Sequence, residues 1–161
     1  MVSSGHNYTM NIKKLLISTL AVLGLATSFS FADEKKVRFE VTGNDFFQFD
    51  KKFLEASVGQ EITIVFKNIG KQPKEAVGHN LVVVKPETVV PQFAMKCASA
   101  KDNNYIPTAK ADKEPVVAST KILGPGEKDS ITFTVEEAGD YPFFCSFPGH
   151  FGVMNGTLTV K

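Results

Sequence analysis

The feature that most constrains the fold is a series of short segments in which apolar and polar residues alternate. Alternation with a period of two is typical of strands that bury one face. The apolar positions of these segments, together with one continuous apolar run, are Val37, Phe39 and Val41; Ile62, Ile64 and Phe66; Leu81 to Val84; Ile131, Phe133 and Val135; Tyr141, Phe143 and Cys145; and Leu158 and Val160. Turn-forming sequences separate them at 43–45, 58–60, 124–126 and 138–140. We therefore predict an all-β fold, a Greek-key sandwich or barrel of seven to eight strands.

One stretch, residues 86–112, breaks this pattern. Apolar residues recur there at the spacing of a helix: Val90, Phe93 or Ala94, and Cys97. Thr88 precedes them and is a candidate N-cap. We expect one short helical insertion between two strands, followed by a polar loop over 102–104.

The first 32 residues are expected to lie outside this domain. Lys13 and Lys14 form a positive head, residues 15–31 carry no charge, and Ser30-Phe31-Ala32 has small residues where a signal peptidase reads. A membrane-spanning helix is the alternative, but the apolar stretch is marginal in length and no positive cluster follows it. We predict upstream residues and a signal peptide over 1–32, cleaved after Ala32, and one domain over 33–161.

The predicted domain is almost neutral. The whole chain of 161 residues has a formal net charge of +1, and without Lys13 and Lys14 the domain keeps 16 basic residues against 17 acidic ones. Phosphate binding needs a basic surface, so nucleic acid is not expected as a partner. Residues able to bind a soft metal are scarce in the domain: His79, His150, Cys97, Cys145, Met95 and Met154.

The segment 141–154 concentrates these residues. Cys145 ends an apolar strand, a Pro-Gly turn follows at 148–149, and then come His150 and Met154. With His79 from a distant part of the chain, this loop offers one ion a thiolate, two imidazoles and a thioether. Two histidines and a cysteine with a weak axial methionine are the ligand set of a blue-copper electron-transfer site.

Other interpretations of these residues remain open. An exported chain with two cysteines is normally suspected of a disulfide, here between Cys97 and Cys145. That pairing would leave the Cys-x4-His-x3-Met spacing without a purpose. Zinc fits the same ligands, although the Irving–Williams order places Cu(II) above it.

Further motifs extend along nearly the whole domain. They are Val41-Thr-Gly-Asn-Asp45, Gly78-His-Asn80, Thr120-Lys-Ile-Leu-Gly124, Gly126-Glu-Lys-Asp-Ser130, Phe143-Phe-Cys-Ser-Phe-Pro-Gly-His150 and Met154-Asn-Gly-Thr-Leu-Thr159. On these motifs the chain resembles a cupredoxin, and most closely an azurin.

The resemblance implies a role for each residue of the site. The three strong copper ligands would be Cys145, His79 and His150. Met154 would be the weak axial ligand, and the carbonyl of Gly78 would face copper from the opposite side.

Three neighbours would support these ligands. By the same resemblance, Asn80 would tie the two ligand loops together. Backbone N–H groups near Ser146 and Phe147 would donate hydrogen bonds to the Cys145 sulfur, which tunes the reduction potential.

The resemblance also implies a docking surface. His150 would lie near the surface in an apolar patch with Phe47, Val77, Phe147 and Gly149. Such a patch suits brief contacts with redox protein partners, and no stable membrane association is expected.

The chain departs from azurins at two places. The disulfide that azurins carry near the amino terminus is absent, because the matching positions are about Val37 and Gln60. Cys97 stands where azurins usually have a methionine. It could be a half-exposed thiol beside the copper site, an inert buried or half-buried thiol, or a thiol that pairs between molecules.

The predicted function is a small periplasmic type 1 (blue) copper protein that transfers single electrons between redox partners by Cu(I)/Cu(II) cycling. It is not expected to be an enzyme, since a catalytic copper would need further histidines and a cysteine hydrolase would need an orienting residue. The alternative is a periplasmic protein of copper binding and delivery, although delivery sites usually have exposed Met and His clusters that this chain lacks.

Overall fold

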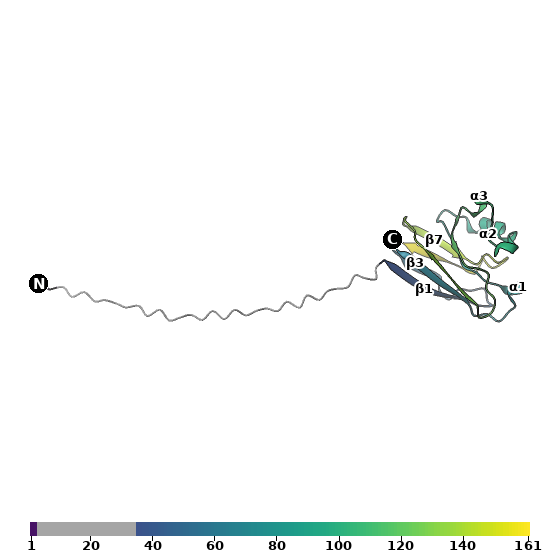
Figure 1. Ribbon diagram of the computed structural model, residues 1–161, viewed down its shortest axis with the longest axis horizontal. Coiled ribbons are helices and arrows are strands. Elements are labelled where there is room, and N and C mark those ends of the chain that lie inside the picture. Colours follow the sequence, from purple (N-terminus) through teal and green to yellow (C-terminus); the bar gives the residue numbers. More distant parts are fainter. Residues whose placement is uncertain (3–34) are drawn as a thin grey trace. The chain divides into compact units, whose positions relative to one another are not determined.

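The computed structural model describes Met1, Val2 and residues 35–161 (Figure 1). The predicted signal peptide and its cleavage after Ala32 lie outside the described residues. The described residues form eight strands: β1 Lys36–Gly43, β2 Phe53–Ala56, β3 Glu61–Asn68, β4 Val82–Val84, β5 Val116–Ser119, β6 Lys128–Phe133, β7 Gly139–Phe144 and β8 Asn155–Val160. The helices are short: α1 Lys74–Val77, α2 Val90–Ala98, the 3-10 helix η1 Lys101–Asn103 and α3 Lys110–Lys113. Among the described residues, none of these helices is long and apolar enough to cross a membrane.

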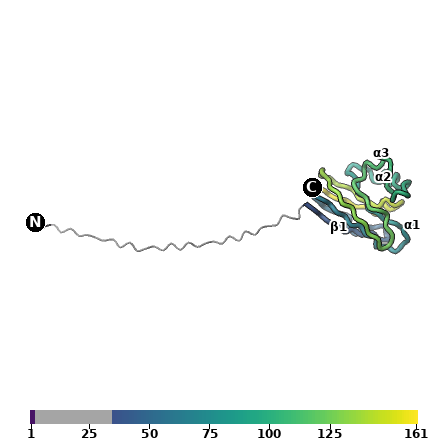
Figure 2. The backbone as a smooth tube through the Cα atoms, in the orientation of Figure 1, coloured from purple at the N-terminus to yellow at the C-terminus, as the bar shows by residue number. Residues whose placement is uncertain are grey.

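The strands form two sheets that pack face to face. One sheet has three strands in the order β1-β3-β6, and the other has five in the order β2-β8-β7-β4-β5. β1 pairs with β3 and β2 with β8 in parallel, whereas the remaining pairs are antiparallel. The path of the chain between the sheets can be followed in Figure 2. The predicted all-β sandwich with a short helical insertion is confirmed.

The main core lies between the two sheets. Alternation in β3 turns Ile62, Ile64 and Phe66 inward, and none of the three retains any exposed surface. Phe66 meets Phe49 edge to face, with ring centroids 5.6 Å apart. Burial of such side chains contributes about 1.5–3 kcal/mol each, so this interface is the main source of stability.

A second, smaller core lies on the outer side of the five-stranded sheet. Strand β4 is buried on both faces: Val83 points into the main core, whereas Val82 and Val84 join the second cluster. The second cluster is closed by Phe93 and Cys97 of α2. The continuous apolar run in β4 is therefore explained by a helix that covers the outer face of its sheet.

Helix α2 has the buried face predicted from its spacing, but not the predicted start. Phe93, Ala94 and Cys97 are its buried residues. The N-cap is Val89 and makes no side-chain hydrogen bond, so the predicted Thr88 cap is wrong. Proline in the first turn replaces a side-chain cap, because its missing N–H has no intrahelical partner to lose and its fixed φ suits a helix start.

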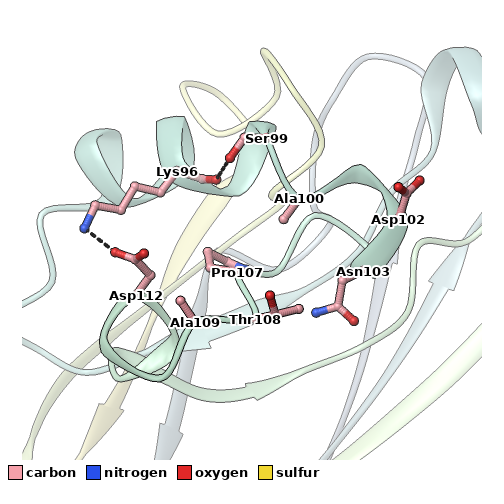
Figure 3. Close-up of a pocket in the computed structure, with 9 residues that line it drawn as sticks. All are labelled: Lys96, Ser99, Ala100, Asp102, Asn103, Pro107, Thr108, Ala109 and Asp112. Atoms are coloured by element: carbon pink, nitrogen blue, oxygen red, sulfur yellow. Dashed lines mark hydrogen bonds and ion pairs between the residues drawn. The ribbon is translucent and has the colours of Figure 1, made fainter.

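The helical insertion encloses a polar pocket of its own (Figure 3). Lys96 of α2 forms an ion pair with Asp112 of α3, with 2.8 Å between Nζ and Oδ1. The Ser99 hydroxyl donates to the carbonyl of Lys96 at the end of α2. None of the predicted metal ligands lines this pocket.

Candidate metal centre

Cys145 follows the last residue of β7 and continues its inward-facing side. Phe143 and Cys145 belong to the main core, whereas Phe144 between them belongs to the second cluster. The Cys145 side chain is fully buried. Its backbone N–H donates to the carbonyl of Met154 at 3.0 Å, which closes the base of the loop between β7 and β8.

Hydrogen bonds inside this loop bring its polar residues back toward Cys145. The N–H of His150 donates to Phe147 O at 3.1 Å, and the N–H of Met154 donates to His150 O at 2.9 Å. Gly149 has φ of +83°, a left-handed conformation that suits glycine. The Pro-Gly sequence thus produces the tight turn that it predicts.

His79 reaches the same point from the loop before β4. Its backbone pairs with Leu123: His79 N donates to Leu123 O at 3.1 Å, and Leu123 N donates to His79 O at 2.7 Å. The His79 side chain is fully buried. Its position is therefore set by an isolated bridge between two loops rather than by a regular strand.

The three side chains meet in one buried cluster. Their candidate ligand atoms all lie within 4.8 Å of one another. Cys145 Sγ is 3.9 Å from His79 Nδ1 and 3.5 Å from His150 Nδ1. Both imidazoles thus turn the same ring nitrogen toward the sulfur.

Met154 lies at the opposite end of the loop and is fully buried in the same core. Its methyl group packs against Gly43 of β1, where an added Cβ would come within 2.6 Å of Met154 Cε. Glycine at this position therefore leaves room for the Met154 side chain. Gly78, the other predicted ligand, is buried immediately before His79.

Burial sets the protonation of the cluster. It raises the pKa of the Cys145 thiol to about 12, against hydrogen bonds from the backbone of Asn80 and Phe147 to the sulfur. Burial, and then the neighbouring His79, lowers the pKa of His150 to about 4. Burial also lowers the pKa of His79, opposed by Asp45 and the Asn44 backbone.

This donor set fits a soft cation. At neutral pH the two imidazoles are uncharged and have lone pairs to offer, and a metal ion would displace the thiol proton. Thiolate and thioether suit copper(I), and imidazole suits copper in either state. The chemistry of the residues therefore agrees with the copper site predicted from the sequence.

Asn80 connects the two segments that carry the ligands. Its amide nitrogen donates to Ser146 Oγ at 2.8 Å, and its oxygen accepts from Ser146 N at 2.8 Å. The N–H of Ser146 is therefore engaged by Asn80 rather than by the sulfur. The backbone groups that bond to the sulfur belong to Asn80 and Phe147.

Asn104 completes this connection and was not found from the sequence. Its carbonyl accepts a second bond from the Asn80 amide at 3.2 Å, and its side chain accepts from Ile122 N at 3.0 Å. Asn104 has φ of +54°, which asparagine tolerates better than most residues. The Asn-Asn pair at 103–104 was a turn signal, but nothing in it indicated the partner.

Aromatic rings surround His150. The ring of Phe47 lies 4.4 Å from it and that of Phe147 4.8 Å, between centroids, each tilted by about 30°. Val77 is half-buried and Gly149 is exposed. His150 itself keeps 5% of its surface exposed.

Phe46 is an exposed aromatic residue that the sequence analysis missed. It precedes Phe47 in the turn after β1, and 79% of its surface is exposed. Two adjacent phenylalanines in a polar turn were the signal that could have found it, because one of them was bound to face solvent.

Cys97 is buried, which agrees with one of the alternatives that its sequence left open. It has no exposed surface and packs in the second cluster under α2, so it is not a half-exposed thiol beside the site. Both cysteines are free, so the alternative of a disulfide between them is wrong. Burial raises the pKa of the Cys97 thiol to about 12, which makes it inert.

Comparison with known proteins identifies the family. Residues 35–161 match the model of the copper binding proteins of the plastocyanin/azurin family. The chain is 43% identical to azurin-1 of Alcaligenes xylosoxydans xylosoxydans over 123 residues, which are 74% of this chain and 93% of that protein. It is 42% identical over 123 residues to outer membrane protein H.8 of Neisseria gonorrhoeae, covering 74% of this chain and 65% of that protein. An azurin of Methylomonas sp. strain J (Az-iso2) has a similar structure, with a TM-score of 0.69 and 34% identity over 77% of this chain and 97% of that one.

The chain therefore belongs to the plastocyanin/azurin family of copper-binding proteins. Within that family it is an azurin homologue, an electron-transfer blue copper protein whose cluster of two histidines, a cysteine and a methionine is typical of a type 1 copper site. Members of this family are electron carriers rather than enzymes, and an electron carrier implies redox partners.

Proposed function

We propose that Cys145 Sγ and the Nδ1 atoms of His79 and His150 are the three strong copper ligands, with Met154 as the weak axial ligand and the Gly78 carbonyl opposite it. The observation that carries this proposal is the convergence of the three donor atoms of buried side chains within 4.8 Å of one another. Bound copper supplies the Cu(I)/Cu(II) couple that accepts and releases one electron.

The protein's own residues make this exchange fast by holding the ligands still. Cys145, His150 and Met154 lie on a loop closed by the bond from Cys145 N to Met154 O, and His79 is bridged to Leu123. Asn80 joins the two segments through buried hydrogen bonds. Ligands that are fixed before metal binding move little when the charge of the ion changes, so little reorganisation accompanies each electron.

A redox partner would dock over His150. Three features support this: His150 is the ligand with residual exposure, the Phe47 and Phe147 rings lie against it, and Phe46 stands exposed beside Phe47. We call Phe46, Phe47, Val77, Phe147 and Gly149 the His150 patch. An apolar patch of this kind suits a weak contact that dissociates after each transfer.

The periplasm is the proposed compartment. The uncharged segment after Lys13 and Lys14 supports export, and one relative is an outer membrane protein. Cleavage after Ala32 and a mature domain of 33–161 remain proposals. Sequencing the amino terminus of the protein secreted to the periplasm of a bacterial host should give Asp33.

The ligand proposal is tested by adding one equivalent of Cu(II) to the metal-free protein. We expect an intense visible band from charge transfer between thiolate and copper, bleached by ascorbate and restored by ferricyanide. The band should saturate at one copper per chain, because the described residues offer one such cluster.

Two results would count against this proposal. A pale complex, without the intense band, would show that the thiolate does not bind Cu(II). A tight colourless Cu(I) complex that cannot be oxidised to a blue form would favour copper delivery instead.

The patch is tested by Phe46→Lys with Val58→Lys as the matched control. Both residues are exposed, and Val58 lies at the other end of the sandwich, where its N–H bonds to the C-terminal Lys161. We expect Phe46→Lys to slow electron self-exchange between copper(I) and copper(II) forms by about tenfold or more, because like charges then meet across the contact. Equal rates for the two variants would exclude the patch as the docking surface.

A further inference from the structure

Asn68 is a buried polar residue that the copper site itself does not use. It is the last residue of β3, and only 1% of its surface is exposed. Its amide nitrogen donates to Leu123 O at 3.0 Å, and its amide oxygen accepts from Gly70 N at 2.8 Å. Burying an amide group without hydrogen bonds costs free energy, so losing either of these two hydrogen bonds would destabilise the fold.

Leu123 is also the residue that holds His79. Its carbonyl accepts from His79 N as well as from Asn68, and its own N–H donates to His79 O. One carbonyl oxygen thus connects the end of β3 to the backbone of a metal ligand. A displacement of Leu123 would be passed directly to His79, because they are bonded in both directions.

The other hydrogen bond of Asn68 fixes the segment that leads to His79 along the chain. Gly70 begins the loop before α1, and Asp45 accepts from the next two N–H groups, those of Lys71 and Gln72. Asn68 is therefore connected to His79 in two ways. One connection runs through Leu123, which is bridged to His79, and the other runs through Gly70 and the chain that leads to His79.

Asn68 is itself on a rigid frame. Its backbone N–H donates to Glu127 O at 3.0 Å, and its carbonyl accepts from Gly126 N at 2.9 Å. These bonds continue the pairing of β3 with β6 beyond the end of the strands. Because its backbone is fixed to the sheet, the Asn68 side chain sets the position of Leu123 relative to the sheet and does not move with the loop.

We propose that Asn68 is a positioning residue for the copper site: by bracing Leu123 it fixes the backbone of His79, and so the direction of Nδ1 toward the Cys145 sulfur. This inference rests on the proposed role of His79 as a ligand. It adds a residue that touches neither the metal nor a ligand side chain.

The test uses Asn68→Leu, which keeps the branched shape of the side chain, though it is larger, and removes both side-chain hydrogen bonds. Asn68→Ser is a second variant in case the first does not fold, since its shorter side chain leaves Leu123 without its donor. Ile62→Val in the same strand is the control, because it lowers stability at the end of β3 remote from Asn68 without touching Leu123.

Two measurements are made on each protein. In the metal-free form, hydrogen exchange of the His79 and Leu123 amides should become at least about tenfold faster in the Asn68 variants than in Ile62→Val, because the local structure opens more easily. In the copper form, the copper hyperfine splitting and the reduction potential should shift in the Asn68 variants and stay at the parent values in Ile62→Val.

The outcomes are distinct. Unchanged exchange and an unchanged copper spectrum in the Asn68 variants would overturn the inference, as would faster exchange confined to Gly70. Equal changes in Ile62→Val would assign the effect to stability in general and would also overturn it. If the parent protein forms no blue complex, the proposed function fails, while the exchange rates still decide whether Asn68 braces His79.

Discussion

Replacing Cys145 by serine is expected to abolish the blue copper band completely, whereas replacing Cys97 by serine should leave it intact. The two cysteines are both fully buried, and burial raises both thiol pKa values to about 12. Burial and acidity therefore do not distinguish them. What distinguishes them is their surroundings: two imidazole nitrogens lie within 4 Å of the Cys145 sulfur, whereas Cys97 packs in the apolar second cluster and, among the described residues, belongs to no group that could hold a metal.

The physical reason for the large effect is the chemistry of the donor atom. Thiolate is a soft, charged ligand that copper binds in both oxidation states, whereas a serine hydroxyl is a hard donor that stays protonated. Copper held by Cys145→Ser would keep the two imidazoles as its remaining strong ligands. We expect a pale complex with weaker copper affinity.

Cys97→Ser should act on stability instead. Its hydroxyl would lie among Val82, Val84 and Phe144 without an evident partner, which costs about 1–3 kcal/mol. Cys97→Ala is the control that removes the thiol without adding a polar group. Visible spectra of copper-loaded proteins, together with urea unfolding of the metal-free forms, separate the two roles. A blue Cys145→Ser protein, or a colourless Cys97→Ser protein that is folded, would contradict this assignment.

The metal cluster was predictable because most of it is local in sequence. Cys145, His150 and Met154 lie on one loop between two strands, and a hairpin brings the ends of such a loop together. His79 was predictable because few histidines were available. The family motifs added the identity of the site but not the details of its hydrogen bonds.

The parts of the fold that were not predicted depend on contacts between residues far apart in the sequence. β5 has no alternation to detect, because all four of its residues are half-buried at the edge of the sheet. β2 does alternate, but over four residues only. The edge positions of both strands are properties of the sheet order, which no local pattern contains.

The burial of Cys97 and the hydrogen bond of the Ser146 N–H to Asn80 also depend on the tertiary structure. Helical spacing placed Cys97 on the apolar face of α2 but did not say whether that face turns to the metal or to the outer side of the sheet. Ser146 was expected to serve the sulfur through its N–H, yet Asn80 accepts that hydrogen. In both cases the direction of the group, rather than its position along the chain, required the tertiary structure.

Phe143→Ala is expected to cause the largest loss of stability among single substitutions of the strand that carries Cys145. The ring is fully buried between the sheets, 5.5 Å from Phe49 between centroids, and its backbone pairs with Val83 and Gly156 on the two neighbouring strands. Truncation of a buried phenylalanine costs about 3–5 kcal/mol, since the central strand β7 has little freedom to collapse into the cavity.

The control is Phe53→Ala, the same chemical change at a residue that is 83% exposed on the edge strand β2. A surface substitution of this kind changes stability by about 0.5 kcal/mol or less. Urea unfolding of the metal-free proteins measures both values, and a difference below about 1 kcal/mol would contradict the role given to the main core.

Bound copper stabilises the folded state by mass action. The copper-loaded Phe143→Ala protein should therefore recover part of its lost stability, whereas Phe143→Ala combined with Cys145→Ser should recover much less. These results would show that the core and the metal centre stabilise the same strand. The core would do so through the packing of Phe143, and the metal centre through Cys145, the ligand that follows β7.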